Sequence, residues 1–347
     1  MTLKVGLIGC GGIMRPHVEG WKGISDRAEV VALADVSEQA MAQRAAQFGH
    51  DVKKYTDYRD LLADSEVDAV DIALPHFLHR DAIVDSAQAG KHLMTEKPLC
   101  LTLEEADDIA KAVKASGIVM MAAHNQLFFP AVLQAKQMVM NGDLGEIYMI
   151  HSFDCSERRG PISLNKATWE GPKPAVDRGW RGDPAKMGGG EYIDTGYHPT
   201  YRLLFLAGQM PVQVTAMMGS YRLGLDEEDT ANVMVKFADG SMGHVYTSWA
   251  MNAPGSKPIL FSISGEGGQI WGEAGKLFFK PIDMQRPAVV RYPGWDYART
   301  FAAEIEHFVN AIEQGFEPLN SVTEATNTLR VILAAYESTD SDRIVSL

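Results

Sequence analysis

Short apolar runs alternate with longer helix-forming segments through about the first 121 residues of the chain. The apolar runs are KVGLIG, EVVALAD, AVDIAL, HLMTEK and IVMMAA. The segments 37–48 and 102–115 between them are rich in helix formers, and Thr102 followed by Glu105 matches a capping box. Alternation of this kind predicts a parallel sheet that is covered by helices on both faces.

After Pro130 the pattern changes. A hairpin is predicted where alternating apolar positions flank Asp239-Gly240, and ILFSISGEGGQIWGEAGKLFFK resembles a meander of short antiparallel strands. Helices are expected over 130–140, 190–206, 297–313 and 322–338. We therefore predict a doubly wound α/β domain over 1–123 and an α+β domain over 124–347, whose C-terminal helix is a candidate to pack back on the first domain.

Composition narrows the class of protein. Hydrophobic residues make up 46% and charged residues 22% of the chain, as in ordinary globular proteins. The net charge of −13 repels phosphate backbones and anionic lipid, which argues against nucleic-acid and membrane partners. The cysteines Cys10, Cys100 and Cys155 are odd in number and scattered, a usage typical of reduced thiols. We expect a cytoplasmic protein.

A glycine loop follows the first predicted strand. It carries Gly9, Gly11, Gly12, Ile13 and Met14. Gly9 and Gly11 match the fingerprint of dinucleotide-binding loops, whereas Met14 replaces its third glycine. The second predicted strand ends in Asp35, at about the distance expected for an acid that binds a ribose. Because a carboxylate repels a 2′-phosphate, the pattern favours NAD over NADP; the alternative is an ordinary turn beside a strand end.

Glu96-Lys97-Pro98 comes just after the fourth apolar run, where ligands of open α/β sheets bind. A lysine beside a nicotinamide can exchange a proton with the reacting hydroxyl or carbonyl. The alternative is a surface Glu-Lys pair before a helix. Pro75, His76 and His79 follow the third run, but no further ligand at metal-site spacing accompanies the two histidines, so we expect no metal.

Asp194 and His198 lie four residues apart, which places them on one face of the predicted helix. Histidine is the usual proton carrier near neutral pH, and an aspartate can orient it or bind a substrate hydroxyl. The alternative is a structural helix histidine, although Pro199 would disturb the helix beside it. Tyr197 and His124 are further candidates for substrate binding.

These parts in this order resemble the glucose-fructose oxidoreductase / inositol dehydrogenase (Gfo/Idh/MocA) family. The segments that carry the resemblance are GLIGCGGI, LPHFLH, AGKHLMTEKPL, HNQLFFP and WRGDPAKMGGGEYIDTGYHP. The resemblance implies a Rossmann domain followed by an open, mostly antiparallel sheet whose outer face often forms oligomer contacts. It therefore implies a homodimer or homotetramer.

The resemblance also implies residue roles. Lys97 would orient the substrate and assist proton transfer, His198 would be the acid/base, and Asp194 would hydrogen-bond substrate. Residues implied to contact the nicotinamide side of the cofactor are Leu74, Pro75, His76, His79, Glu96, Asn125, Trp180 and Arg181. This chain departs from the family pattern at His76, where Asn is common, and at residues 126–128, which read QLF.

The expected activity is reversible oxidation of a secondary alcohol of a monosaccharide, cyclitol or related polyol, with Arg158 and Trp169 as candidate substrate contacts. One alternative is cleavage of a glycoside through transient oxidation by a recycled NAD. The other is a sugar- or nucleotide-sensing protein without catalysis. A short-chain dehydrogenase is excluded, because no tyrosine is followed four residues later by lysine.

Overall fold

The computed structural model describes residues 2–156, 179–223, 226–251 and 259–347, and the chain divides into two compact units. Unit 1 comprises residues 1–128 and 297–326, and unit 2 comprises 129–296 and 327–347. The sequence placed helix 297–313 in the second domain. The structure assigns it to unit 1, because the buried face of α10 (Tyr297–Gln314) joins the core formed by α1 (Met14–Gly23).

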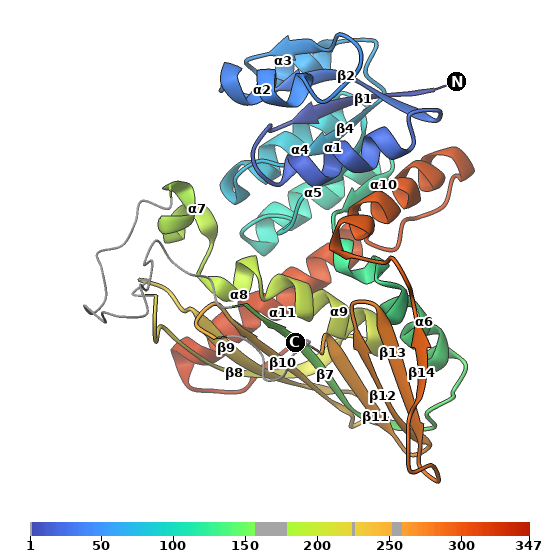
Figure 1. Cartoon of the computed structure of the whole chain (residues 1–347). Helices are drawn as coiled ribbons and strands as arrows, with labels where there is room; N and C mark the ends of the chain where they lie inside the picture. Colours follow the sequence, from blue (N-terminus) through green and yellow to red (C-terminus); the bar gives the residue numbers. More distant parts are fainter. Residues whose placement is uncertain (1, 157–178, 224–225, 252–258) are drawn as a thin grey trace, which may run out of the picture. The chain divides into compact units, whose positions relative to one another are not determined.

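Unit 1 is built on a parallel sheet, in its described part six-stranded, with order β3-β2-β1-β4-β5-β6 (Figure 1). The strands are β1 (Leu3–Ile8), β2 (Ala28–Ala34), β3 (Lys53–Tyr55), β4 (Ala69–Ile72), β5 (His92–Thr95) and β6 (Met120–Ala122). The remaining helices are α2 (Glu38–Ala45), α3 (Tyr58–Ala63), α4 (His79–Gln88) and α5 (Leu103–Ser116). This strand order is that of a Rossmann fold, so the predicted fold class is confirmed.

The sequence located every strand of this sheet except β3. The five predicted runs are apolar because those strands are buried on both faces. In contrast, β3 reads KKY, its two lysines are exposed, and it pairs only with β2 at the edge of the sheet. The N-cap predicted at Thr102 is confirmed, because the N–H of Glu105 donates to Thr102 Oγ1 at 3.2 Å, but the Glu105 carboxylate accepts from the N–H of Leu101 at 2.8 Å and so does not complete the capping box.

Unit 2 contains an open sheet, nine-stranded over its described residues, with order β14-β13-β12-β11-β7-β10-β9-β8-β15. Only β7 and β10 pair in parallel; the other pairs described are antiparallel, as predicted. The strands are β7 (Ile147–Cys155), β8 (Pro211–Gly219), β9 (Thr230–Phe237), β10 (Met242–Ser248), β11 (Phe261–Gly265), β12 (Gly268–Glu273), β13 (Lys276–Pro281), β14 (Ala288–Arg291) and β15 (Val345–Ser346). The predicted hairpin is β9–β10, with Asp239-Gly240 in its turn.

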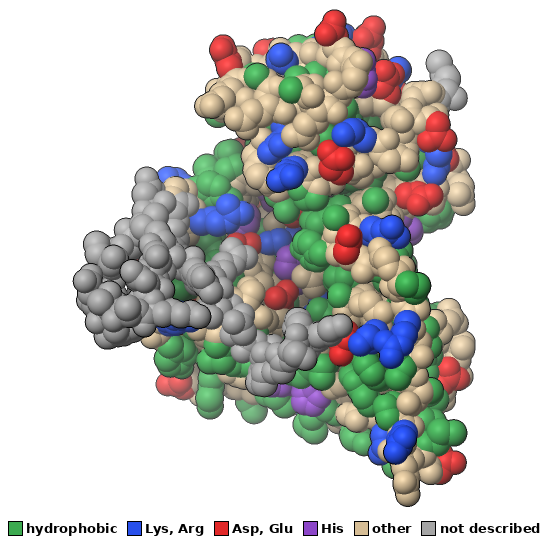
Figure 2. Space-filling model, viewed as in Figure 1, with side chains coloured by type: hydrophobic (Ala, Val, Ile, Leu, Met, Phe, Trp, Pro, Cys, Tyr) green, Lys and Arg blue, Asp and Glu red, His purple; other side chains and the backbone are tan. Residues whose placement is uncertain are grey.

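Among the described residues, helices lie on one face of this sheet and none covers the other (Figure 1). The covering helices are α6 (Pro130–Met140), α8 (Glu191–Asp194), α9 (Tyr197–Ala207) and α11 (Val322–Ser341), which begins in unit 1, whereas the short helix α7 (Pro184–Met187) lies away from the sheet (Figure 1). The buried Arg202 of α9 donates from Nε to Ser152 Oγ at 3.1 Å and from Nη2 to Phe153 O at 2.7 Å. Figure 2 shows hydrophobic side chains gathered over β8 to β10.

The single helix predicted over 190–206 is divided into α8 and α9. Pro199 has no N–H to donate to Thr195 O, and the N–H of His198 donates to that oxygen instead, at 3.0 Å. The chain therefore makes a tighter, i→i−3 turn at His198, the residue that the sequence analysis selected as a candidate acid/base. In the part of the chain that the structure describes, no helix is long and apolar enough to cross a bilayer.

Candidate active site

The candidate residues of unit 1 all follow the carboxyl ends of its strands. The glycine loop follows β1, Asp35 follows β2, and residues 74–79 follow β4. Residues 96–98 follow β5, and residues 124–125 follow β6. Because the strands are parallel, these segments share one edge of the sheet, the edge at which open α/β sheets bind ligands.

The glycines of the loop serve different purposes. Gly9 has φ +91°, and a Cβ on it would lie 2.3 Å from Ala73 O, so the fold itself requires glycine there. A Cβ on Gly11 or Gly12 would meet nothing within 4 Å. Protein packing therefore does not explain these two glycines, whereas close approach of a pyrophosphate to the backbone and to the start of α1 does.

Arg44, which the sequence did not single out, fixes the orientation of this loop. Its buried guanidinium donates from Nε to Cys10 O at 3.2 Å and from Nη2 to Gly11 O at 2.9 Å. In a planar trans peptide the N–H points opposite to the C=O. The N–H groups of Gly11 and Gly12 consequently point away from Arg44, as a phosphate-binding loop needs.

Asp35 lies beside this loop and beside a cavity. Its carboxylate accepts from the N–H of Cys10 at 2.7 Å and from the N–H of Ser37 at 2.7 Å. The cavity has a volume of about 270 Å³. Its lining residues are Ile8, Ala34, Asp35, Val36, Thr56, Asp57, Tyr58, Arg59, Leu74 and Leu78. A mostly apolar cavity next to Asp35, the acid that we expect to bind the ribose, suits an adenosine, so the residues present fit NAD.

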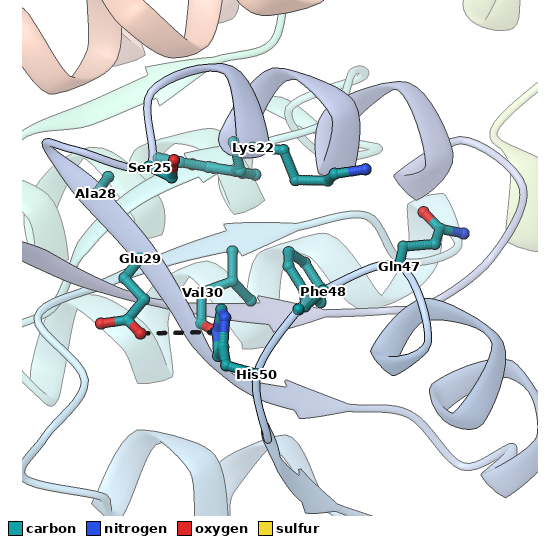
Figure 3. A pocket seen from close by; sticks show the side chains of 10 residues that line it. Lys22, Ser25, Ala28, Glu29, Val30, Gln47, Phe48 and His50 are labelled. Atoms are coloured by element: carbon teal, nitrogen blue, oxygen red, sulfur yellow. Dashed lines mark hydrogen bonds and ion pairs between the residues drawn. The ribbon is translucent and has the colours of Figure 1, made fainter.

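A second cavity of about 270 Å³ opens at the amino end of β2, the opposite end from Asp35 (Figure 3). Its wall includes Phe48 and His50, and His50 Nε2 lies 3.7 Å from Glu29 Oε1. Because ligands of open α/β sheets bind at the carboxyl ends of the strands, this cavity is not part of the dinucleotide site.

Glu96 is buried and both of its carboxylate oxygens have donors. Oε1 lies 3.0 Å from His17 Nε2, and Oε2 accepts from the backbone N–H of Lys97 at 3.1 Å. Burial opposes ionisation, but the hydrogen bond and charge of His17 outweigh it and lower the pKa of Glu96. Glu96 is therefore an ionised carboxylate next to Lys97.

His79 holds two of the loops together. Its Nδ1 lies 2.6 Å from Pro98 O and its Nε2 lies 2.9 Å from Leu74 O, so the ring joins the loop after β4 to the loop after β5. Burial lowers the pKa of His79. The ring of His76 packs against it with centroids 6.0 Å apart. Within the described ranges, no group of three or more His, Cys, Asp or Glu side chains is placed to hold a metal.

His124 and Asn125 complete this edge. Burial, with the positive charge of Lys97 adding to it, lowers the pKa of His124 to about 3, so its imidazole is neutral at pH 7. Asn125 donates from Nδ2 to Thr300 Oγ1 of α10 at 2.9 Å. The side chain of Met14, in contrast, is fully buried in the core. A cofactor contact from Met14 would have to come from its backbone.

In unit 2 the structure brings together several residues that the sequence listed separately. Asp194 is buried at the end of α8, and Arg181 Nε lies 3.4 Å from its Oδ2. The guanidinium of Arg181 also stacks 4.2 Å from the centre of the Trp180 ring. His198 is partly exposed in the first turn of α9, with Nδ1 2.8 Å from the hydroxyl of Tyr201.

The other candidates of unit 2 have different surroundings. Tyr197 is fully buried and packs against Tyr201 with ring centroids 6.2 Å apart. Arg158 and Trp169 lie outside the described residues. The sequence also missed Glu228, which explains part of the GGG motif, because a Cβ on Gly190 would lie 2.3 Å from Glu228 O.

The family is identified by two matches along the chain. Residues 3–124 match the oxidoreductase family with the NAD-binding Rossmann fold, and residues 132–271 match the GFO/IDH/MocA C-terminal domain. Inositol 2-dehydrogenase of Rhizobium meliloti is 26% identical over 359 residues, which cover 100% of both chains. Levoglucosan dehydrogenase of Pseudarthrobacter phenanthrenivorans is 30% identical over 300 residues, or 78% of this chain and 73% of that one.

Solved structures share the fold. Levoglucosan dehydrogenase in complex with NADH has a TM-score of 0.88 at 24% identity, covering 100% of this chain and 99% of that one. Together with the Rossmann order of the first sheet, the matches confirm the resemblance seen in the sequence. The chain therefore belongs to the GFO/IDH/MocA family of oxidoreductases and carries the NAD-binding Rossmann domain of that family.

Proposed function

We propose that this oxidoreductase interconverts a secondary alcohol and a ketone on a monosaccharide, cyclitol or related polyol. The observation that supports the proposal is an NAD-binding Rossmann domain in a chain with dehydrogenases among its relatives. These relatives, matched over most of their length, are named inositol 2-dehydrogenase and levoglucosan dehydrogenase. NAD, when bound, accepts the hydride. The glycine loop would hold its pyrophosphate and Asp35 its adenosine ribose, which disfavours a 2′-phosphate.

The residues of this chain would position the polyol and move its proton. We assign Lys97 to the reacting hydroxyl, Asp194 to a substrate hydroxyl and His198 to the proton. If His198 donates from Nδ1 to Tyr201 Oη, Nε2 is the nitrogen that accepts a proton. His124 stays neutral at pH 7 and can hydrogen-bond without adding charge beside Lys97.

The test is turnover of the purified chain with NAD and a panel of cyclitols, sugars and anhydrosugars, followed by NADH absorbance. Lys97→Ala should lower kcat/KM about 100-fold or more, the scale of a lost proton-transfer group. Lys111→Ala is the matched control, because the Lys111 side chain is exposed on α5 and its ammonium lies 4.0 Å from Asp108. Full turnover by Lys97→Ala, or glycoside cleavage without NADH accumulation, would contradict the proposal.

We also propose a cytoplasmic homodimer or homotetramer that associates through the exposed face of the open sheet. Partly exposed apolar and aromatic side chains from neighbouring strands meet on this face. Met242 pairs in register with Met149, and Tyr246 pairs with Phe153. Light scattering on the eluting protein gives the oligomer mass, and a monomer at micromolar concentration would contradict this assembly.

A further inference from the structure

His17 of α1 is fully buried between two carboxylates that come from different strands. Its Nδ1 lies 2.9 Å from Oδ2 of Asp71 in β4, and its Nε2 lies 3.0 Å from Oε1 of Glu96 after β5. The ring also packs against Phe301 of α10, with centroids 5.3 Å apart. Neither the cofactor fingerprint nor the family motif accounts for this histidine.

The hydrogen bonds around His17 fix its protonation state. Asp71 Oδ2 also accepts from Trp21 Nε1 at 2.8 Å, and Glu96 Oε2 accepts from the N–H of Lys97 at 3.1 Å. Ionised carboxylates only accept hydrogen bonds, so both ring nitrogens of His17 must donate. His17 is therefore an imidazolium, although burial alone would lower its pKa; the charges of Asp71 and Glu96 raise it well above the usual value.

A third acid faces the same cluster without adding charge. Glu304 of α10 is fully buried, and neither of its oxygens has a hydrogen-bond partner among the described residues. Burial, followed by the neighbouring carboxylates, raises its pKa well above the usual value, so its carboxyl is neutral. The charged members of the cluster are thus one cation, His17, and two anions, Asp71 and Glu96.

We propose that His17 is a positioning residue for the nicotinamide half of the NAD site, acting through the Glu96 carboxylate. This inference rests on the proposed placement of Glu96 at the nicotinamide ribose and of Lys97 at the substrate. A charged donor on Oε1 fixes the carboxylate in one orientation, and Oε2 is then aligned to accept from the Lys97 backbone. Removing that donor frees Glu96 to rotate or to take up a proton, and the segment that carries Lys97 loses a fixed acceptor.

Two near-isosteric variants separate the two hydrogen bonds of the ring. The amide nitrogen of asparagine falls close to the position of Nδ1, and that of glutamine falls close to Nε2. His17→Gln should therefore keep the donor toward Glu96 and lose the one toward Asp71. His17→Asn should keep the donor toward Asp71 and lose the one toward Glu96, so each variant is the matched control of the other.

The measurement is binding to the purified chain of NADH, by nicotinamide fluorescence, and of ADP, by calorimetry. His17→Asn should weaken NADH binding about 10- to 100-fold, the effect of losing a charge-assisted hydrogen bond, and leave ADP binding unchanged. His17→Gln should bind NADH within about 3-fold of the unaltered chain, a difference below the scale of one such bond. Equal NADH affinities in the two variants, or parallel loss of NADH and ADP binding, would overturn the proposal.

A spectroscopic test does not depend on the variants folding. Nitrogen-15 spectra of the histidine rings at pH 8 should show both nitrogens of His17 carrying protons, and a neutral ring would overturn the proposal. Failure of the polyol assignment has a different signature. In that case the chain binds NADH and the two His17 variants still differ, but no polyol is turned over.

Discussion

Each unit of this protein buries a cluster of acids, and the two clusters accommodate a buried carboxyl in different ways. In unit 1, Asp71 and Glu96 lie on either side of His17, which supplies a positive charge to both. In unit 2, the donors that reach Glu228 are neutral groups. The N–H of Tyr192 donates to its Oε1 at 2.7 Å and the hydroxyl of Tyr336 at 2.8 Å.

Glu191, a second buried acid of this cluster, must carry a proton. Thr247 Oγ1 contacts both Glu191 Oε1 and Asp154 O, the latter at 2.9 Å. A threonine hydroxyl has one proton, and the carbonyl of Asp154 can only accept it. The proton between Thr247 and Glu191 therefore belongs to Glu191. Burial raises the pKa of Glu191 well above the usual value, and the charges of Asp154, Glu228 and Asp194 add to that effect.

Comparison of the two clusters distinguishes the effect of burial on a carboxyl from the effect of an oppositely charged neighbour. Asp71 and Glu191 are both fully buried, so both lose hydration on folding. The cost of desolvation is offset by an opposite charge for Asp71 and is avoided by protonation for Glu191. Replacing a carboxyl by the matching amide should therefore have different consequences in the two units.

The largest effect should come from Asp71→Asn. The change removes a counterion of the buried imidazolium, and breaking a buried ion pair costs about 3 to 5 kcal/mol of unfolding free energy. Glu191→Gln is the matched control, because it replaces a neutral acid by a neutral amide. Calorimetric unfolding at pH 7 should show a lower transition for Asp71→Asn and no loss for Glu191→Gln. Equal losses in the two variants would remove the distinction between the clusters.

A smaller effect should appear when Glu191→Gln is followed against pH. Because the folded pKa of Glu191 is raised, the folded state keeps a proton that the unfolded chain releases above about pH 4.5. The unaltered chain should lose stability as pH rises from there, and glutamine does not titrate. At pH 8 the variant should be more stable by about 1 to 3 kcal/mol, because each pKa unit between the folded and unfolded states is worth about 1.4 kcal/mol, and at pH 4 the two chains should be equal. A gain of the same size at pH 4 and pH 8 would contradict this protonation state.

The parts of this molecule that could be predicted from the sequence are those whose pattern lies in adjacent residues. The apolar runs of β1, β2, β4, β5 and β6 and the glycine-containing turn of β9–β10 are properties of adjacent residues. The Rossmann fold and the positions of Asp35 and Lys97 at strand ends could be read from them. The edge strand β3 could not, because KKY has no buried face to leave an apolar pattern.

The residues that sequence reasoning missed act through partners that are far away along the chain. Arg44 holds a carbonyl 33 residues away, and His17 bridges carboxylates 54 and 79 residues away. Helical periodicity shows which face of a helix is buried, but it does not show which polar side chain on that face will meet an acid. Only the tertiary structure pairs His17 with Glu96, or Tyr336 with Glu228.

The smallest effect should come from Tyr336→Phe, which removes a neutral donor from the cluster of unit 2. The Tyr336 hydroxyl donates to Glu228 Oε1 at 2.8 Å and accepts from the N–H of Ile193 at 3.2 Å. Loss of a hydrogen bond from a neutral donor costs about 1 kcal/mol of unfolding free energy, less than the loss of a buried counterion. Tyr221→Phe is the control, because the Tyr221 side chain is 76% exposed.

The pH dependence of Tyr336→Phe tests the same cluster further. Burial already raises the pKa of Glu228, and the Tyr336 hydroxyl opposes that rise. Without the hydroxyl the folded pKa should rise further, so the folded chain would hold its extra proton to higher pH. The cost of Tyr336→Phe should accordingly be larger at pH 8 than at pH 4 in thermal unfolding. A cost that does not vary with pH would mean that the hydroxyl stabilises the fold without acting on the charge of Glu228.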